Sequence, residues 1–396
     1  MADLTMQLPE KITISDIVDQ AERATHMVSQ VRSRMLAPNA VKNPPVFSIT
    51  QLASLCGIDK GQVTYRLGKG DLPNGQLNEK GTRREFSLSE ARVWVRQYRA
   101  ASQRPDGARA ITVAVGNFKG GVSKTTTAMV LAQGLSLRGH KVLAIDADPQ
   151  GSLTTLFGIM PDTEVTEDQT IAPLAYGETD TIRPAIQQTY WDGVDLVAAS
   201  SSLFSAEFVL PSRQMKDPSF QFWDVLNLGL EDIRDDYDVI IIDTPPSLSY
   251  VTINAFMAAD GLLVPLPPNA LDFASSAQFW SLFSDLASNL VENAGITKSF
   301  NFIHVLLARV DSSDVASDVV RGWITATYGE KVLPVEIPKT AVTSSSSAEF
   351  GTVYDINRYE GNTKTYSRAR DAYDRVNDLV EISIRNAWLL QLKEGT

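Results

Sequence analysis

The 396-residue sequence holds few of the residues that build covalent or metal-centred frameworks. Its only cysteine is Cys56, which excludes a disulfide scaffold and a metal site built from cysteines. No apolar run approaches the roughly eighteen residues of a membrane-spanning helix. The first residues also lack the basic-then-apolar order of a secretory signal peptide. We therefore expect a cytoplasmic protein.

Positive charge is also scarce, and it is unevenly distributed. The net charge of −11 argues against a surface that binds nucleic acid over its whole extent. Residues 1–100 nevertheless carry fourteen Lys and Arg against ten Asp and Glu, so the remainder of the chain sums to −15. This asymmetry favours contact between the N-terminal part and a polyanion.

The pattern of apolar residues divides the chain into three expected domains, 1–45, 46–105 and 106–396. In the first, a helix is expected over residues 15–35, and proline residues follow it. A lone helix cannot bury an apolar stripe on itself, so the protein or a partner subunit must cover it. The stripe comprises Ile14, Ile17, Val18, Ala21, Ala24, Val28, Val31 and Met35.

In the third domain, short apolar runs alternate with amphipathic segments long enough to form helices. This alternation is typical of an α/β fold with a mostly parallel sheet covered on both faces. The expected strands span residues 111–115, 142–145, 194–198, 239–242, 262–266, 302–307 and 332–337.

A glycine-rich segment joins the first of these strands to an expected helix over residues 125–138. Glycines allow backbone N–H groups to close around phosphate oxygens, and the helix N-terminus adds its positive end. Lys124 would neutralise the β- and γ-phosphates, while the Thr125 hydroxyl would bind Mg²⁺. Phe118 and Ser123 stand where the standard phosphate loop has glycines, and Lys119 adds a second cation.

Two acidic sites accompany the loop. Asp146 and Asp148 follow a strand, and the alternation of side chains along a strand predicts that both point off its C-terminal edge. Open α/β sheets bind ligands at that edge. Asp243 follows four apolar residues and would hold Mg²⁺ through water. A carboxylate at a strand end often only forms a turn, but the nearby phosphate loop favours the functional interpretation.

Together these motifs resemble the ParA/MinD group of deviant-Walker ATPases over residues 110–396. The resemblance implies a P-loop NTPase fold that binds ATP or ADP with Mg²⁺ and hydrolyses ATP. It implies catalytic roles for Lys119, which would act across a dimer interface, for Lys124, and for Asp148, which would position the attacking water. Thr125 and Asp243 would bind the Mg²⁺ ion. The implied nucleotide-binding residues are Lys119, Gly120, Gly121, Val122, Ser123, Lys124, Thr125, Thr126, Pro265 and Pro267.

The second domain begins with a segment, Ile49–Leu67, that fits a helix-turn-helix with Gly57 in its turn. Gly81–Phe86 resembles the wing of winged-helix domains, where arginines contact phosphates. The expected core residues of the motif are Leu52, Ala53, Cys56, Val63 and Leu67. The expected DNA contacts are Gln62, Thr64, Tyr65, Arg66, Arg83 and Arg84. A small helical packing domain without a ligand is the alternative.

This domain order resembles the large, Type Ia branch of plasmid partition ParA proteins, including the RepA proteins of RepA/RepB/RepC systems. The resemblance implies a homodimer whose N-terminal helix assists dimerisation and whose winged domain binds its own operator. It also implies non-specific DNA binding in the ATP form, association with the nucleoid, and a ParB partner that stimulates hydrolysis. A nucleotide-sensing repressor without significant turnover and a chromosomal segregation ATPase are the alternatives.

Non-specific DNA binding requires a local basic surface on this acidic protein. The strongest candidates are Arg358, Lys364, Arg368 and Arg370, with Lys339 upstream. A solvated start of the last helix, expected over residues 366–392, is the alternative. Acidic residues interleave with the arginines of this helix, unlike the strongly basic terminus that anchors a protein to a membrane. We therefore expect no membrane partner.

Overall fold

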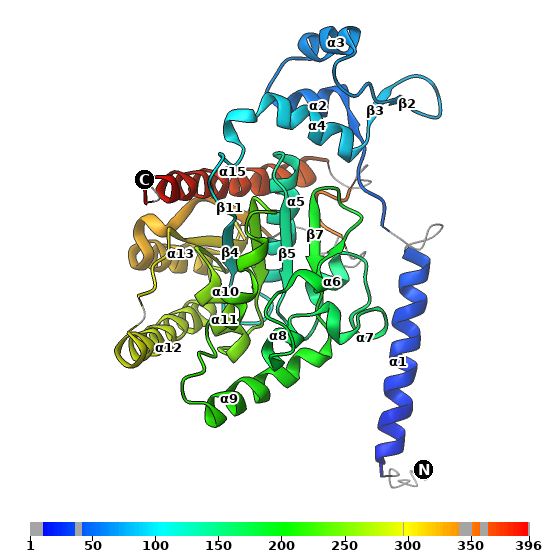
Figure 1. Cartoon of the computed structure of the whole chain (residues 1–396). Helices are drawn as coiled ribbons and strands as arrows, with labels where there is room; N and C mark the ends of the chain where they lie inside the picture. Colours follow the sequence, from blue (N-terminus) through cyan, green and yellow to red (C-terminus); the bar gives the residue numbers. More distant parts are fainter. Residues whose placement is uncertain (1–10, 36–41, 296, 340–350, 357–362, 395–396) are drawn as a thin grey trace. The chain divides into compact units, whose positions relative to one another are not determined.

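The computed structural model describes residues 11–35, 42–295, 297–339, 351–356 and 363–394 (Figure 1). The chain divides into two compact units, Met1–Lys42 and Asn43–Thr396. The first contains helix α1 (Ile14–Met35), which confirms the expected N-terminal helix. No helix in the described ranges is long and apolar enough to cross a membrane.

The second unit begins with a small helical region over residues 46–102. Its strands form an antiparallel sheet in the order β1-β3-β2. Ser48 caps helix α2, Gly57 ends it with a φ of 69°, and Asp59 caps helix α3. The predicted inward residues Leu52, Ala53, Cys56 and Val63 are buried, and Leu67 packs against the same core. The elements are β1 (Phe47–Ser48), α2 (Ile49–Cys56), α3 (Lys60–Lys69), β2 (Gln76–Leu77), β3 (Arg84–Phe86) and α4 (Leu88–Tyr98).

The remainder of the second unit is built on an eight-stranded sheet in the order β11-β10-β9-β4-β8-β5-β7-β6. All neighbouring strands are parallel except β6, which pairs antiparallel with β7. The seven predicted strands are confirmed, and only the two-residue strand β6 was not expected. The strands are β4 (Ile111–Val115), β5 (Val142–Asp146), β6 (Gln187–Gln188), β7 (Val194–Val197), β8 (Val239–Asp243), β9 (Gly261–Leu266), β10 (Phe302–Val310) and β11 (Val332–Pro338).

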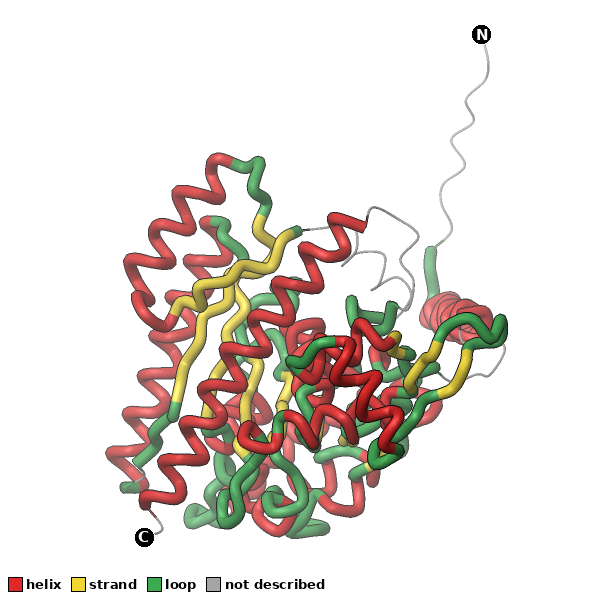
Figure 2. The backbone as a smooth tube through the Cα atoms, turned by 90° about the horizontal axis from the view of Figure 1, so that it is seen from above, coloured by secondary structure: helices red, strands yellow, loops and turns green. Residues whose placement is uncertain are grey.

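Helices cover both faces of this sheet (Figure 2). Alternate residues of each central strand belong to different cores, because successive side chains point to opposite faces. Ile241 packs in a core with α5 and α15, whereas Ile240 and Ile242 pack in a second core with α8 to α12. The helices are α5 (Lys124–Leu137), α6 (Ser152–Leu156), α7 (Pro161–Glu164), α8 (Ala172–Tyr176), α9 (Ala206–Lys216), α10 (Val225–Gly229), α11 (Tyr250–Ala258), α12 (Ala270–Ala294), α13 (Val315–Tyr328) and α15 (Thr363–Glu394).

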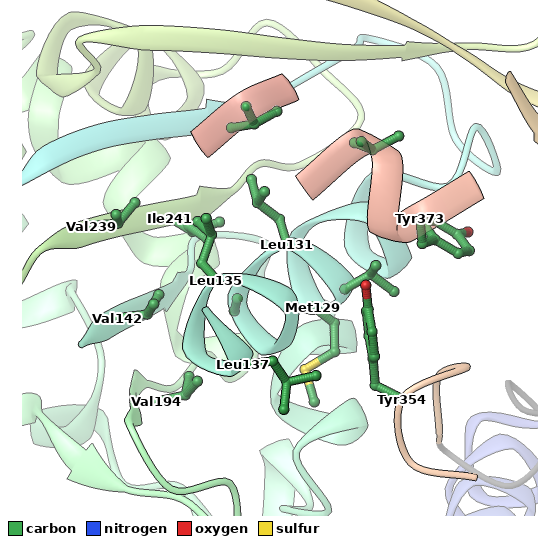
Figure 3. Close-up of a cluster of buried hydrophobic side chains, with 14 of the residues drawn as sticks. Met129, Leu131, Leu135, Leu137, Val142, Val194, Val239, Ile241, Tyr354 and Tyr373 are labelled. Carbon is green, nitrogen blue, oxygen red and sulfur yellow. The ribbon is translucent and has the colours of Figure 1, made fainter. Parts of the chain in front are cut away.

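Helix α5 lies at the centre of the first core. Figure 3 shows Met129, Leu131 and Leu135 of α5 among strand residues such as Val239, with Tyr373 of α15 on another side. Twelve of the fourteen residues of α5 are buried, which explains why its sequence lacks a polar face. The helix that follows the phosphate loop is therefore fixed along most of its length.

The small helical region is attached to the C-terminal end of α5 by buried charges. Arg92 of α4 is 8% exposed and donates to the carbonyl oxygens of Ser136 (3.1 Å) and His140 (2.9 Å). Arg99 donates to Glu381 of α15 at 2.6 Å, and the other carboxylate oxygen of Glu381 lies 2.8 Å from His140 Nε2. These contacts hold the region on the part of the same unit that is built on the eight-stranded sheet.

Glu381 is charged because of its partners. Burial acts to raise its pKa, but the hydrogen bond with His140 and the guanidinium charges of Arg99 and Arg138 outweigh burial, so the pKa lies below its ordinary value. Arg138, at the end of α5, also donates to Asp378 at 2.6 Å. The buried guanidinium groups at this end of α5 thus all have carboxylate or carbonyl partners.

Candidate nucleotide-binding site

The loop between β4 and α5 has the backbone geometry of an anion-binding turn. Gly121 and Ser123 both have a φ of 74°, in the left-handed region that favours glycine. Ser123 is directly followed by α5, so the free N–H groups of the helix N-terminus face the end of the loop. The glycine expected at position 123 is therefore replaced by a serine that keeps the conformation of a glycine. The loop retains the shape that binds phosphate.

Lys124 is the buried cation of this loop. It is 6% exposed, and its Nζ donates to the carbonyl oxygen of Lys119 at 2.8 Å. Burial lowers the pKa of Lys124, while the charges of Asp243 and Asp148 act in the opposite direction. A lysine ammonium has three N–H donors, so the bond to Lys119 leaves two for phosphate oxygens.

Asp243 lies at the end of β8 and is completely buried. No donor in the described part of the chain meets ordinary hydrogen-bond geometry with either of its carboxylate oxygens, although the Thr125 hydroxyl lies near enough to favour the charged form. Burial and the neighbouring Asp146 carboxylate raise the pKa of Asp243 well above its ordinary value, and the Thr125 hydroxyl and the Lys124 ammonium act to lower it. A buried carboxylate without a partner is costly unless a ligand completes it. Among the described residues, no cation directly contacts this carboxylate, although the Lys124 ammonium lies near it.

Asp146 and Asp148 differ more than the sequence suggested. Strand β5 ends at Asp146, so the alternation that was expected to align the two side chains does not continue to Asp148. Asp146 is fully buried and accepts hydrogen bonds of 2.8 Å from both the backbone N–H and the hydroxyl of Thr154. Burial raises its pKa to about 7. Asp146 therefore fixes the segment that carries Asp148.

Asp148 is nearer to the surface and is 8% exposed. One of its oxygens accepts from the backbone N–H of Gln150 at 2.9 Å. This bond orients the carboxylate without using all of its lone pairs. Asp148 is thus held in one direction beside Lys124 and Asp243, whose pKa values its charge affects.

The outer side of the loop borders a cavity of about 360 Å³. Lys119 forms an ion pair there with Asp272, a buried residue in the first turn of α12. Pro267 and Pro268 lie on the cavity wall, and their contact with a nucleotide stays a prediction. Pro265 lies behind it in β9, where its carbonyl oxygen accepts from Asn117 at 2.9 Å. The remaining lining residues are Gly120, Gly121, Val122, Asn269, Arg309, Asp311, Asp314, Ser317 and Lys339.

The structure adds residues that sequence reasoning did not connect with the loop. Asp272 and Arg309 come from distant segments, and no local motif marks them. Asn117 lies inside the loop and carries a side-chain contact to β9 that its position alone did not reveal. Lys339, which was grouped with the C-terminal basic residues, lines the cavity beside the phosphate loop.

A larger cavity of about 720 Å³ lies elsewhere, between α13, β11 and α15. Arg321, Arg368 and Arg375 line it together with Glu336 and Asp371. None of the phosphate-loop residues takes part in it. This cavity is therefore not a candidate for the nucleotide site, although it is the larger of the two.

The predicted DNA contacts of the small region fall into two groups. Gln62, Thr64 and Tyr65 are exposed along α3, and Arg83 is exposed between β2 and β3. Arg66, in contrast, forms an ion pair with Asp71 at 3.1 Å and lies over the ring of Tyr98. The guanidinium of Arg84 donates to the carbonyl oxygen of Asn74 at 2.5 Å. The two engaged arginines thus have intramolecular partners that compete with a phosphate.

The predicted C-terminal contacts also differ. Lys364 and Arg368 are exposed at the start of α15, whereas Arg358 lies outside the described residues. Arg370 stacks 4.0 Å from the centre of the Tyr354 ring and pairs with Asp374 at 3.3 Å. Its position indicates a packing role, and its contact with DNA stays a prediction.

Comparison with known proteins agrees with this geometry. Residues 110–296 match a family described as an AAA domain. A protein named putative replication protein A, from Rhizobium rhizogenes, is 33% identical over 90% of this chain and 90% of its own length. The chromosome partitioning protein ParA of Caulobacter vibrioides is 31% identical over 67% of this chain and 95% of its own length.

One solved structure extends the comparison to ligands. Cobyrinic acid a,c-diamide synthase from Mycobacterium smegmatis, with bound ADP and magnesium, is 28% identical with a TM-score of 0.52. The match covers 68% of this chain and 93% of that one. The part of this chain built on the eight-stranded sheet has the fold of a P-loop NTPase.

Proposed function

Because the chain belongs to the ParA/MinD-type family of Walker ATPases, we propose that it is a plasmid partition ATPase whose ATP-bound dimer binds DNA and whose hydrolysis releases it. The observation that carries this proposal is the pair of unsatisfied, buried oxygens of Asp243 beneath a phosphate loop with a buried lysine. Such a site lacks an anion at the loop and a cation at the carboxylate. ATP with Mg²⁺ supplies both.

The residues present fit magnesium. Asp243 is a buried carboxylate without a hydrogen-bond partner among the described residues, and the Thr125 hydroxyl lies close enough to act on its pKa. Carboxylate and hydroxyl oxygens are ligands that Mg²⁺ accepts, directly or through water. When bound there, the ion would offset the charge of the β- and γ-phosphates. The relative with bound ADP and magnesium supports this assignment.

The protein's own groups then hold the triphosphate. The N–H groups of residues 120–126 would surround the phosphates, and the two donors of Lys124 that have no acceptor among the described residues would neutralise them. Asp148, oriented by the N–H of Gln150, would direct the attacking water in line with the γ-phosphate. The loop and the base are both fixed before ATP binds, which is the condition for electrostatic stabilisation of the transition state.

Lys119 gives the site its dependence on a second subunit. It lies on the outer side of the loop, where its ammonium is paired with Asp272. We propose that closure of two subunits transfers this ammonium to the nucleotide of the partner, as the family resemblance implies. ATP-dependent dimerisation and hydrolysis are thereby coupled.

DNA binding is assigned to two surfaces. Gln62, Thr64, Tyr65 and Arg83 are exposed on the small region, which we propose binds the operator of its own operon as a winged helix. Lys364 and Arg368 are exposed near the end of the chain and are proposed for non-specific binding in the ATP state. A ParB-like partner would then stimulate hydrolysis and release the DNA.

The test is hydrolysis by the full-length protein with Mg²⁺, measured alone, with random DNA, and with DNA plus a ParB-type centromere-binding protein. We expect slow basal hydrolysis that rises at least about tenfold when both are present. An Asp243→Asn variant should lose this activity and its dependence on Mg²⁺. Negligible hydrolysis under all conditions, with ATP still bound, would favour a nucleotide-sensing repressor instead.

A further inference from the structure

Arg309 combines a strained backbone with a position in the cavity on the outer side of the phosphate loop. It lies near the end of β10 and has a φ of 54°, which a residue with a side chain rarely adopts. In the described ranges, only Arg309 and Ser123 of the phosphate loop are non-glycine residues with a positive φ. Backbone strain of this kind concentrates at functional sites. The positive φ of Arg309 therefore suggests a functional role for this residue.

The Arg309 side chain contacts the phosphate loop from outside. Its Nη1 donates to the carbonyl oxygen of Gly121 at 2.6 Å. In an anion-binding loop the N–H groups point toward the phosphate, and the cavity that Arg309 shares with Lys119 is not lined by Lys124 or Asp243. The guanidinium thus lies on the side of the loop opposite the nucleotide that the same chain binds. This is also the side that Lys119 occupies.

The charge of Arg309 remains available there. The cavity holds two other cations, and both have carboxylate partners: Lys119 pairs with Asp272, and Lys339 lies 3.7 Å from Asp311. Arg309 is exposed, and the bond to Gly121 is its one hydrogen bond within the described part of the chain. A guanidinium has five N–H donors in a planar fork that matches the oxygens of a phosphate. Four of these donors have no acceptor among the described residues.

We propose that Arg309 is a second cation of the dimer face, which contacts the phosphates of the nucleotide bound by the opposing subunit, beside Lys119. This inference rests on the proposed ATP-dependent dimer. The bond to Gly121 holds the guanidinium in place before the subunits meet, so less side-chain freedom is lost on closure. The phosphates of the nucleotide in the opposing subunit would then contact the bidentate guanidinium of Arg309 as well as the ammonium of Lys119.

The experiment uses the full-length Arg309→Gly variant. Glycine adopts a positive φ without strain, so this change removes the side chain and keeps the backbone conformation. We expect the affinity of the dilute, monomeric variant for a fluorescent ATP analogue to stay within about twofold of the parent. We expect its dimerisation with a non-hydrolysable ATP analogue, followed by sedimentation velocity, to weaken by about tenfold or more, and kcat to fall in parallel.

Two further variants distinguish a phosphate contact made by Arg309 from a structural role of this residue. Arg309→Lys keeps a cation and should recover part of the dimerisation that Arg309→Gly loses. Lys331→Ala removes an exposed cation that does not line this cavity and should leave dimerisation within about threefold of the parent. A change confined to thermal unfolding, without loss of dimerisation, would show a structural role and overturn the proposal.

The other outcomes are equally decisive. If Arg309→Gly loses affinity for the ATP analogue as a monomer, Arg309 acts on the nucleotide of its own chain and the proposal is wrong. If dimerisation and kcat are unchanged, Arg309 has no role at the dimer face. If the parent protein binds the ATP analogue through Lys124, so that Lys124→Ala abolishes binding, but does not dimerise, then the proposed ATP-dependent dimer is wrong. That outcome is distinct from a failure of the Arg309 assignment.

Discussion

The two ends of helix α5 are built on opposite principles. At the N-terminal end, Ser123 is held at a positive φ, Lys124 is buried with two free donors, and Asp243 has no partner among the described residues. At the C-terminal end, Arg92 and Arg138 are buried in contacts that use carboxylates and carbonyl oxygens. One end is prepared for a ligand, and the other is already complete.

This difference separates stability from function along one helix. A complete network of buried charges stabilises only if every member stays, so its loss is costly. An incomplete site costs stability in the absence of its ligand and gains it when the ligand binds. Substitutions at the two ends should therefore have effects of opposite kind, and the following predictions test this.

The largest effect is expected at the completed end. Glu381→Ala removes the shared carboxylate and leaves Arg99, Arg138 and His140 without their common partner. The free energy of unfolding should fall by about 3–5 kcal/mol, measured by denaturant titration, while the affinity for ATP in the folded protein stays unchanged. A loss of ATP affinity at temperatures where the variant is fully folded would contradict the separation of the two ends.

The same residue gives a pH dependence. The pKa of Glu381 is held below its ordinary value of 4.5 by its cationic partners. A lowered carboxyl pKa contributes stability above the unfolded-state pKa, and this contribution is lost as the pH falls through the folded-state pKa. The difference in unfolding free energy between the parent and Glu381→Gln should be constant near neutral pH and shrink in acid. If this difference in unfolding free energy grows on acidification, the pKa of Glu381 is raised in the folded protein rather than lowered.

The next effect belongs to the open end. Lys124→Ala removes the buried ammonium, and the affinity for ATP should fall by about 100-fold, measured by titration calorimetry. Since burial already lowers the pKa of Lys124, its removal should change the free energy of unfolding by less than about 1 kcal/mol. Lys331→Ala, in an exposed turn after α13, is the matched control. Strong destabilisation by Lys124→Ala would show that this end is a structural network as well.

A smaller effect is expected on DNA binding by the small region. Arg83 is exposed, so Arg83→Ala should weaken operator binding by about 1 kcal/mol and reduce the salt slope by about one. Arg66 is the matched comparison, because Asp71 and Tyr98 already engage it. Arg66→Ala should lower the stability of the region and leave the salt slope unchanged. Equal salt slopes for both variants would place Arg66 on the DNA as well.

The smallest effect concerns the backbone of the phosphate loop. Ser123 adopts the left-handed conformation at a φ of 74°. Ser123→Gly should raise the free energy of unfolding by about 0.5–1 kcal/mol, because glycine adopts this conformation without strain. ATP binding should persist. Destabilisation by this change would mean that the serine side chain has a role in the loop.

Much of the fold could be predicted because its signals are local. Strands such as β4 and β8 are buried on both faces and therefore read as continuous apolar runs. The loop and Asp243 lie directly after such strands, so their place at the edge of the sheet followed from the order of the elements. Strand β6, with two polar residues at an edge, carries no such signal.

The rest depended on contacts between distant segments. Asp272 and Arg309 reach the loop from α12 and β10, and the bond from Arg309 to Gly121 spans 188 residues of sequence. The attachment of the small region through Arg92 and Glu381 likewise joins residues that no short motif connects. Charge and spacing identify residues that can bind DNA, but they do not show that Arg66 and Arg370 already have partners.

The central claim is that the open end of α5 is completed by a second subunit, and Lys119→Ala tests it most directly. ATP affinity and the rate of ATP hydrolysis in the presence of DNA and ParB should be measured on the same sample. The account predicts an affinity within about twofold of the parent and a hydrolysis rate at least about 100-fold lower. Hydrolysis by Lys119→Ala at the rate of the parent would contradict it.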